Sequence, residues 1–151
     1  MDKNESLAIV RRFFVEKSAP SQALCHLRPG HEMRLLLEGR EECALFYDDG
    51  QVKVEKRIAH RPEIEFIIGS EAIRLMTEHP GDKVSQLGID IIKEILVGHV
   101  QLRVCGSMTR LLTGGYLGII SSGGPEFIAY LKSRGIQGIS KIIQTIRSFK
   151  K

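Results

Sequence analysis

Apolar positions near the N-terminus follow the period of a helix, and further along the chain they alternate. In residues 5–17, ESLAIVRRFFVEK, the apolar side chains recur at helical spacing, which predicts a short amphipathic helix. The segment SAPS is expected to end this helix, because proline does not continue one. From Met33 the runs MRLLLEG, ECALFYDDG and QVKVEKR alternate, with an Asp-Gly turn signal between the last two. They predict a three-stranded antiparallel meander.

The middle of the chain adds a fourth strand and two helices. EIEFIIG alternates with its isoleucines and phenylalanine on one face, so Glu63 and Glu65 are expected on the solvent face. A helix follows over 71–79 and ends at a Pro-Gly pair. In the next segment, 84–96, apolar residues at i, i+3, i+4, i+7 and i+8 form the broadest apolar face in the chain. This helix is expected to bury that face.

The stretch LVGHVQLRVCGSMTRLL, residues 96–112, combines a histidine and a cysteine with an apolar pattern. Its first glycine ends the preceding helix, 99–105 alternates as a fifth strand, and a short helix begins after the second glycine. His99 and Cys105 then share one face of the strand but lie about 20 Å apart at roughly 3.3 Å per residue. A shared metal or thiol site is therefore not favoured, and the valines and leucine of the opposite face are expected to matter more.

The remaining sequence is predicted to be helical. A Gly-Gly pair weakens the segment that follows the fifth strand, and Pro125 is well placed in the first turn of a helix over 126–134. The last segment, 136–151, carries isoleucines on one face and basic or polar residues on the other. Its composition is typical of a helix that contacts an anionic surface.

Composition limits the class of protein. A chain of 151 residues with 42% hydrophobic and 26% charged residues is about the size and balance of one globular domain. No apolar run approaches the roughly 20 residues that span a bilayer, and no signal pattern opens the chain, so a cytoplasmic location is expected. The net charge of +4 is small and spread along the chain, so nucleic acid is not predicted as a partner.

Candidate chemistry is sparse. The three cysteines, Cys25, Cys43 and Cys105, have no zinc-like or disulfide spacing, and no phosphate-binding glycine motif is present, so no metal or cofactor is predicted. Asp90 lies near the rim of the broad apolar face, where a solvated role is favoured, and it is the candidate for the catalytic carboxylate of an acyl-thioester hydrolase. The helices together have more apolar surface than one small sheet covers. The surplus packs helix on helix or lines a cavity for an apolar ligand.

The order of elements resembles the sterol carrier protein 2 family. The stretch that carries the resemblance is PEIEFIIGSEAIRLMTEHPGDKVSQLGIDIIKEILVGHVQLRVCGSMTRLL, residues 62–112, and the resemblance extends over about 33–117. It implies a helix, three strands, a crossover to a fourth strand, helices and a fifth strand, with a lipid tunnel between sheet and helices. By position it implicates as ligand-binding residues Phe66, Ile68, Leu87, Ile91, Ile95, Val100, Leu102, Met108, Leu111 and Leu112.

The sequence is therefore interpreted as one α+β domain over 1–151, with a core of about 33–117 and a helical extension of about 118–151. A mostly antiparallel sheet of about five strands is expected to be covered on one face by amphipathic helices. The predicted function is non-catalytic binding, transfer or presentation of a long-chain lipid, such as a fatty acyl group, a sterol-like molecule or an isoprenoid quinone precursor. Residues 136–151 are the candidate for transient contact with an anionic membrane.

Two alternatives remain open at this point. The first is an accessory or interaction subunit of a lipid or quinone biosynthesis complex, in which the apolar surplus is an interface with a protein partner. The second is an acyl-thioester hydrolase that uses Asp90 or Glu71 beside an apolar groove. Turnover of acyl-CoA, or copurification of a stoichiometric partner, would separate them from the lipid carrier.

Overall fold

The computed structural model describes residues 2–135 and contains a five-stranded sheet with a layer of helices on one face. The predicted helix over 136–151 lies outside the described residues. Among the described residues no helix is long and apolar enough to cross a bilayer. In chain order the elements are α1 (Lys3–Glu16), α2 (Ser18–Leu24), β1 (Met33–Leu37), β2 (Glu41–Asp48), β3 (Gln51–Glu55), β4 (Ile64–Ile68), α3 (Ser70–Glu78), α4 (Val84–Leu96), β5 (Val100–Val104), α5 (Met108–Thr113), α6 (Tyr116–Ser121) and α7 (Gly124–Ser133).

The strands are arranged in the order β3-β2-β1-β4-β5. The meander β1-β2-β3 is antiparallel, as the alternating runs and the Asp-Gly turn predict. The chain then crosses over to place β4 parallel to β1, and β5 pairs antiparallel with β4. The sheet is thus mixed and mostly antiparallel, and both the α+β class and the element order implied by the resemblance are confirmed.

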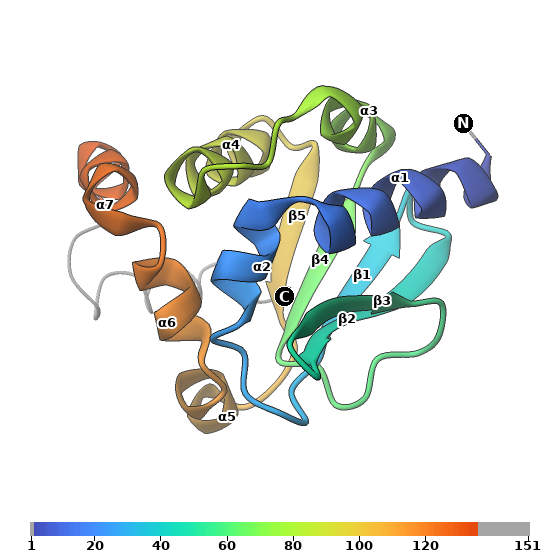
Figure 1. Ribbon diagram of the computed structural model, residues 1–151, viewed down its shortest axis with the longest axis horizontal. Helices are drawn as coiled ribbons and strands as arrows, with labels where there is room; N and C mark the ends of the chain where they lie inside the picture. Colours follow the sequence, from blue (N-terminus) through green and yellow to red (C-terminus); the bar gives the residue numbers. More distant parts are fainter. Residues whose placement is uncertain (1, 136–151) are drawn as a thin grey trace.

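One face of the sheet is the core face. The register aligns Leu35 with Phe66 and Phe66 with Leu102, so these side chains project to the same side. Figure 1 shows α1 and α2 lying across the sheet with α3 and α4 above them, while α5, α6 and α7 stand beside this group, at the left. Leu35 is fully buried and belongs to the core cluster formed between these layers.

The SAPS segment starts a second helix, which corrects the expectation that it only ends the first. Lys17 has extended backbone, so α1 stops there, and α2 begins directly at Ser18. Pro20 is the third residue of α2, in the first turn, where the backbone amide has no partner within the helix and a proline costs little. Periodicity alone did not distinguish this restart from a loop.

The helices α3 and α4 form a single excursion between two paired strands. The chain leaves β4 at Ile68 and re-enters the sheet at Val100, and these two residues are register partners. The amide of Gly69 donates a hydrogen bond to the carbonyl of His99 at 2.9 Å, which joins the two ends of the excursion. A Cβ atom at Gly69 would lie 3.1 Å from the carbonyl oxygen of His99, so there is little room for a side chain at this position.

Candidate functional site: an apolar cavity between sheet and helices

A cavity of about 480 Å³ lies between the core face of the sheet and the helix layer. Its volume falls in the range of about 300–1,000 Å³ that is typical of small-molecule sites. Most of its wall is aliphatic or aromatic. The residues that line it are Phe13, Phe14, Pro20, Ala23, Leu24, Met33, Leu45, Phe66, Ile68, Ala72, Leu75, Met76, Glu78, His79, Leu87, Asp90, Ile91, Lys93, Glu94, Val100 and Ile119.

The sheet supplies one wall of the cavity through alternate residues of four strands. Met33 and Leu45 are register partners on β1 and β2, and Ile68 and Val100 are partners on β4 and β5. Phe66 lies between these pairs on β4. Because successive side chains of a strand point to opposite faces, all five side chains project from the core face. This wall carries no polar side chain.

Helices supply the opposite walls. On α1, Phe13 and Phe14 contact each other edge to face, with ring centroids 5.5 Å apart, and both reach the cavity. On α4, Leu87 and Ile91 are four residues apart and therefore lie one above the other on the same side of the helix. The small side chain of Ala23 on α2 leaves space between these two helices. The cavity thus lies between the side chains of α1, α2 and α4.

A histidine and an aspartate form a polar pair at the cavity. His79 follows α3, and its Nε2 lies 2.7 Å from Oδ2 of Asp90 on α4. The amide of Gly81 donates a hydrogen bond to His79 Nδ1 at 2.9 Å, and the Gln86 side-chain amide donates one to Asp90 Oδ1 at 2.8 Å. The pair joins the end of α3 to the middle of α4.

These hydrogen bonds decide what the pair can do chemically. A general base must accept a proton from water or another nucleophile, and His79 Nδ1 already accepts one hydrogen bond from Gly81. Each oxygen of Asp90 also has a donor. Glu71, the other carboxylate considered for hydrolysis, does not line the cavity and forms an exposed ion pair with Arg74. These hydrogen bonds thus occupy His79 Nδ1, whereas each oxygen of Asp90 can still accept one more hydrogen bond.

The structure brings half of the sequence-predicted ligand residues to the cavity. Phe66, Ile68, Leu87, Ile91 and Val100 line it.

Four of the other predicted residues do not line the cavity. Ile95 and Leu102 are partly buried against the core cluster without reaching the cavity. Leu111 is buried in the core, and Leu112 is 41% exposed, so neither forms part of the cavity wall. Met108 is the first residue of α5, and its side chain lies outside the described part of the chain.

Sequence reasoning missed the walls that come from α1, α2 and the meander. Phe13 and Phe14 were recognised as apolar positions of an amphipathic helix, but the pattern does not say which part of the sheet that helix covers. Leu24 lies in α2, a short helix whose sequence shows no clear period. Met33 and Leu45 had a visible signal, because alternation already placed them on the same face as the core residues of β1 and β2.

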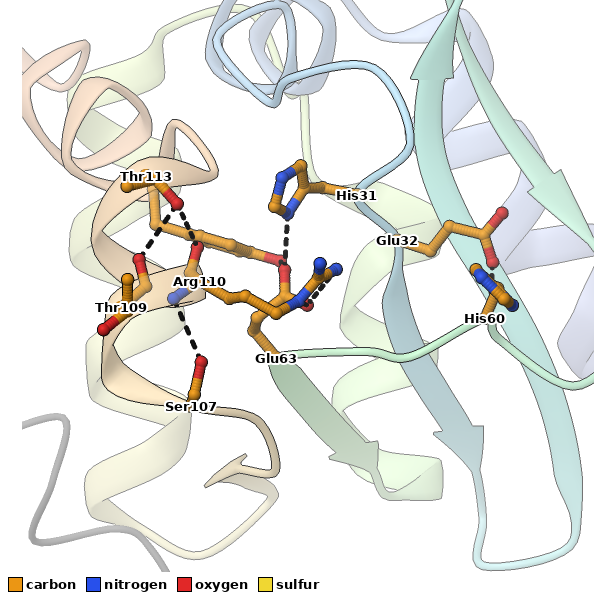
Figure 2. Close-up of polar contacts among 9 residues, drawn as sticks. His31, Glu32, His60, Glu63, Ser107, Thr109, Arg110 and Thr113 are labelled. Atoms are coloured by element: carbon orange, nitrogen blue, oxygen red, sulfur yellow. Dashed lines mark hydrogen bonds and ion pairs between the residues drawn. The ribbon is translucent and has the colours of Figure 1, made fainter.

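Glu63 is the centre of a buried charged cluster outside the cavity, which corrects its predicted position on a solvated face. Its side chain has no exposed surface. Oε2 accepts a hydrogen bond from Arg110 Nε at 3.0 Å, and Arg110 Nη2 lies 2.9 Å from the same oxygen. Oε1 is 2.7 Å from His31 Nδ1 and accepts a bond from the hydroxyl of Tyr116 at 3.3 Å. Figure 2 shows His31 and Arg110 converging on Glu63 from two different parts of the chain.

The cluster fixes α5 and α6 to the start of β4. Tyr116 is the first residue of α6 and is itself buried, and Arg110 belongs to α5. Burial and the adjacent Glu63 carboxylate raise the pKa of the Tyr116 phenol far above its ordinary value, so the phenol stays a neutral donor. Buried carboxylates are stable in a protein only when they are paired and hydrogen-bonded, and Glu63 meets that requirement.

Glu65 is the second carboxylate that the alternation placed wrongly in solvent. It is 1% exposed and lies between Arg34 of β1 and Arg103 of β5, at 2.6 and 3.0 Å. The register aligns all three residues across adjacent strands, so the charges form a row on the face opposite the core. The arginines shield Glu65 from water while their own side chains remain about one third exposed.

The cysteines and histidines of the described residues show no metal centre. No group of three or more potential ligands comes together in residues 2–135. Partial burial and the Glu65 carboxylate raise the pKa of the Cys105 thiol, and burial raises that of Cys43, so both thiols are poor nucleophiles. His99 Nδ1 lies 3.1 Å from Glu94 Oε1, and His99 belongs to no group of three potential ligands among residues 2–135.

The described residues therefore define a class: an α+β fold with a mixed five-stranded sheet and a largely apolar cavity between the sheet and its helices. No family model matches the sequence, and no curated protein matches it. Among solved structures, the chain is similar to one titled "UbiJ-SCP2 Ubiquinone synthesis protein", with 13% sequence identity and a TM-score of 0.41. The match covers 78% of this chain and 90% of that one. A likeness of this size does not transfer a ligand or an activity.

Proposed function

We propose that this protein binds a long-chain lipid in the cavity and holds or hands it over without covalent chemistry. A fatty acyl group, a sterol-like molecule or an isoprenoid quinone precursor each offers the extended apolar surface that such a cavity requires. The observation that carries the proposal is the cavity of about 480 Å³ with apolar walls from the sheet and from α1 and α2. Filling the apolar part of this cavity with a hydrocarbon chain removes apolar surface from water, which is favourable.

The size of the cavity supports binding through the chain of the ligand. Each methylene transferred from water contributes about 0.8 kcal/mol, so roughly ten methylenes contribute about 8 kcal/mol. Part of this is offset by the loss of translational, rotational and chain freedom on binding. No catalytic group is needed for such an affinity. Ligands that differ only in chain length are expected to bind in order of length until the cavity is full.

The first experiment is native mass spectrometry of the freshly purified protein, followed by lipid extraction. A copurified lipid supports the proposal and gives the ligand class. The second is substitution of Ala23 by phenylalanine, because the added ring enters the cavity from α2. Ala23→Phe is expected to weaken binding of a long-chain ligand about tenfold or more.

The matched control is Ala8→Phe, which adds the same ring at an exposed position of α1. The control is expected to bind the ligand as the natural protein does. Thermal unfolding of both variants checks that they fold. Equal binding by the two phenylalanine variants would contradict the assignment of the cavity as the lipid site.

The basic segment 136–151 is the proposed membrane contact. It lies outside the described residues, and the proposal rests on its sequence alone. Binding to vesicles that contain anionic lipid is expected to weaken as salt is raised, because the attraction falls off within a Debye length. Deletion of 136–151 is expected to abolish this salt-sensitive binding, and vesicle binding that survives the deletion would refute the proposal.

A role as an accessory subunit is the second candidate, and exposed apolar side chains favour it. Leu96 and Val97, at the end of α4, are 59% and 63% exposed. Large contiguous apolar patches mark interaction surfaces, and these two neighbouring side chains give the place at which to test for one. A stoichiometric partner that copurifies with the natural protein, and is lost in a Leu96→Glu variant, would support this role. A partner retained by that variant would contact another surface.

A further inference from the structure

Every charged or titratable side chain that lines the cavity comes from one stretch of chain. Glu78 and His79 lie at the end of α3, and Asp90, Lys93 and Glu94 lie on α4. The sheet wall and the walls from α1 and α2 are apolar. A lipid with a polar head and an apolar tail therefore has one orientation that avoids burying its head among hydrocarbon. The head lies at the wall from α3 and α4, and the tail extends toward the sheet and α2.

The protonation of His79 follows from its hydrogen bonds. The Gly81 amide is a donor, so His79 Nδ1, which accepts from it at 2.9 Å, carries no proton. The proton is on Nε2 and is donated to Asp90 at 2.7 Å. The imidazole is thus neutral in this arrangement. The wall from α3 and α4 then holds three carboxylates and one ammonium group, which leaves two net negative charges beside the head of the ligand.

We infer that the cavity selects a lipid with an uncharged, hydroxyl-bearing head group, such as a long-chain alcohol or phenol, and discriminates against a carboxylate or phosphate head. The inference rests on the proposed lipid-binding function and specifies its ligand. A carboxylate oxygen can accept two hydrogen bonds, and each oxygen of Asp90 has one donor, so Asp90 can accept another from a ligand hydroxyl. An anionic head meets like charge at the same place.

Basic groups near this wall do not make its net charge positive. Lys93 is exposed and forms no ion pair with the described residues. The stem of Lys17 packs against Gly81, but Lys17 lines a separate small hollow together with Arg12 and not the cavity. Glu94 is paired with His99, while Glu78 is exposed and has no ion-pair partner among the described residues. Glu78 is thus the unpaired carboxylate of this wall, and Asp90 lies in the same wall beside His79.

The test compares two ligands of equal chain length, 1-hexadecanol and hexadecanoate, at pH 8, where the acid is ionised. Each displaces a neutral apolar fluorescent probe, N-phenyl-1-naphthylamine, from the delipidated full-length protein. The alcohol is expected to bind at least about tenfold more tightly than the acid. In the double variant Glu78→Gln and Asp90→Asn, the ratio of the two affinities is expected to fall at least about threefold. The reason is that the acid binds more tightly, while the affinity for the alcohol changes less.

Two further variants sharpen the test. Glu71→Gln removes an exposed carboxylate of α3 that does not line the cavity, and the preference for the alcohol is expected to be unchanged. Glu78→Gln alone changes only an exposed side chain, so it reports on charge even if the double variant folds poorly. It is expected to move the preference in the same direction as the double variant.

The outcomes separate this inference from the proposed function. Equal affinities, or a tighter acid that weakens in Lys93→Gln, would overturn the neutral-head inference and leave lipid binding standing. A preference for the alcohol that neither Glu78→Gln nor the double variant changes would also overturn it. Failure of both ligands to displace the probe would overturn the proposed function and this inference together.

Discussion

Replacing Glu63 by glutamine tests whether the buried charged cluster holds α5 and α6 to the sheet. The side chain keeps its shape, but an amide nitrogen replaces one of the oxygens that accept from Arg110 and His31. Removing one partner of a buried ion pair typically costs about 3–5 kcal/mol. Arg110 is 32% exposed and regains some hydration, so a loss near the lower end, about 3 kcal/mol, is expected.

This loss is large compared with a total stability of about 5–15 kcal/mol for a domain. The assay is urea unfolding followed by far-ultraviolet circular dichroism, since the chain contains no tryptophan. For a chain of this length about 3 kcal/mol corresponds to a fall in Tm of roughly 6–12 °C. The urea midpoint is expected to fall without a change in the slope, because the surface exposed on unfolding stays the same.

The matched control is Glu71→Gln, which removes one partner of an exposed ion pair. Glu71 and Arg74 are 56% and 63% exposed, so the loss there is expected to be below about 1 kcal/mol. In addition, Arg110→Gln is expected to cost less in the Glu63→Gln background than alone, because its partner is already gone. Equal small losses in Glu63→Gln and Glu71→Gln would refute the reasoning that burial makes the first pair important.

Further predictions concern pH and backbone conformation. The pKa of Tyr116 is raised in the folded state, so its contribution to stability is present below about pH 10 and is lost as pH rises further. The free energy of unfolding, measured with urea, is therefore expected to fall less at alkaline pH in Tyr116→Phe than in the natural protein. Hydrogen bonds from Arg57 lower the pKa of Glu32, so the stability that this pair contributes is present above the ordinary pKa of 4.5 and is lost as pH falls. The free energy of unfolding is therefore expected to depend less on acidic pH in Arg57→Ala. Gly115 and Gly30 both have positive φ, but a Cβ at Gly115 would lie 1.9 Å from a backbone carbonyl oxygen, while a Cβ at Gly30 would have no atom within 4 Å. Gly115→Ala is therefore expected to lower Tm far more than Gly30→Ala. Similar losses of Tm in the two variants would contradict the close approach at Gly115.

The sequence predicted the strands and most helices because their signals are local. Alternation identified β1, β2 and β3, and the broad apolar face over 84–96 has the same bounds as α4. Leu87 and Ile91 reached the cavity because that face points toward the sheet. These successes follow from periods of 2 and 3.6, which depend only on neighbouring residues.

The failures concern partners that are distant in the sequence. Alternation placed Glu63 and Glu65 opposite the core correctly, but it could not show that arginines cover them. Arg103 and Arg110 are 38 and 47 residues away from their carboxylates. In the same way, the contribution of Phe13 to the cavity depends on how α1 crosses the sheet. Burial of a face depends on tertiary packing, and the spacing of apolar residues along the chain carries no information about that packing.

The closed excursion that carries α3 and α4 has a mechanical consequence for loading a ligand. Its two ends are joined at the hydrogen bond from Gly69 to His99, beside the register pair of Ile68 and Val100. A rigid displacement of both helices about that junction widens the cavity without breaking any pairing between strands. Such a displacement would separate α3 from α1, and it would separate α4 from α2, α7 and β5. The hydrogen bonds of the sheet can thus stay intact, and the resistance to such a displacement comes from the packing of α3 and α4 against their neighbours.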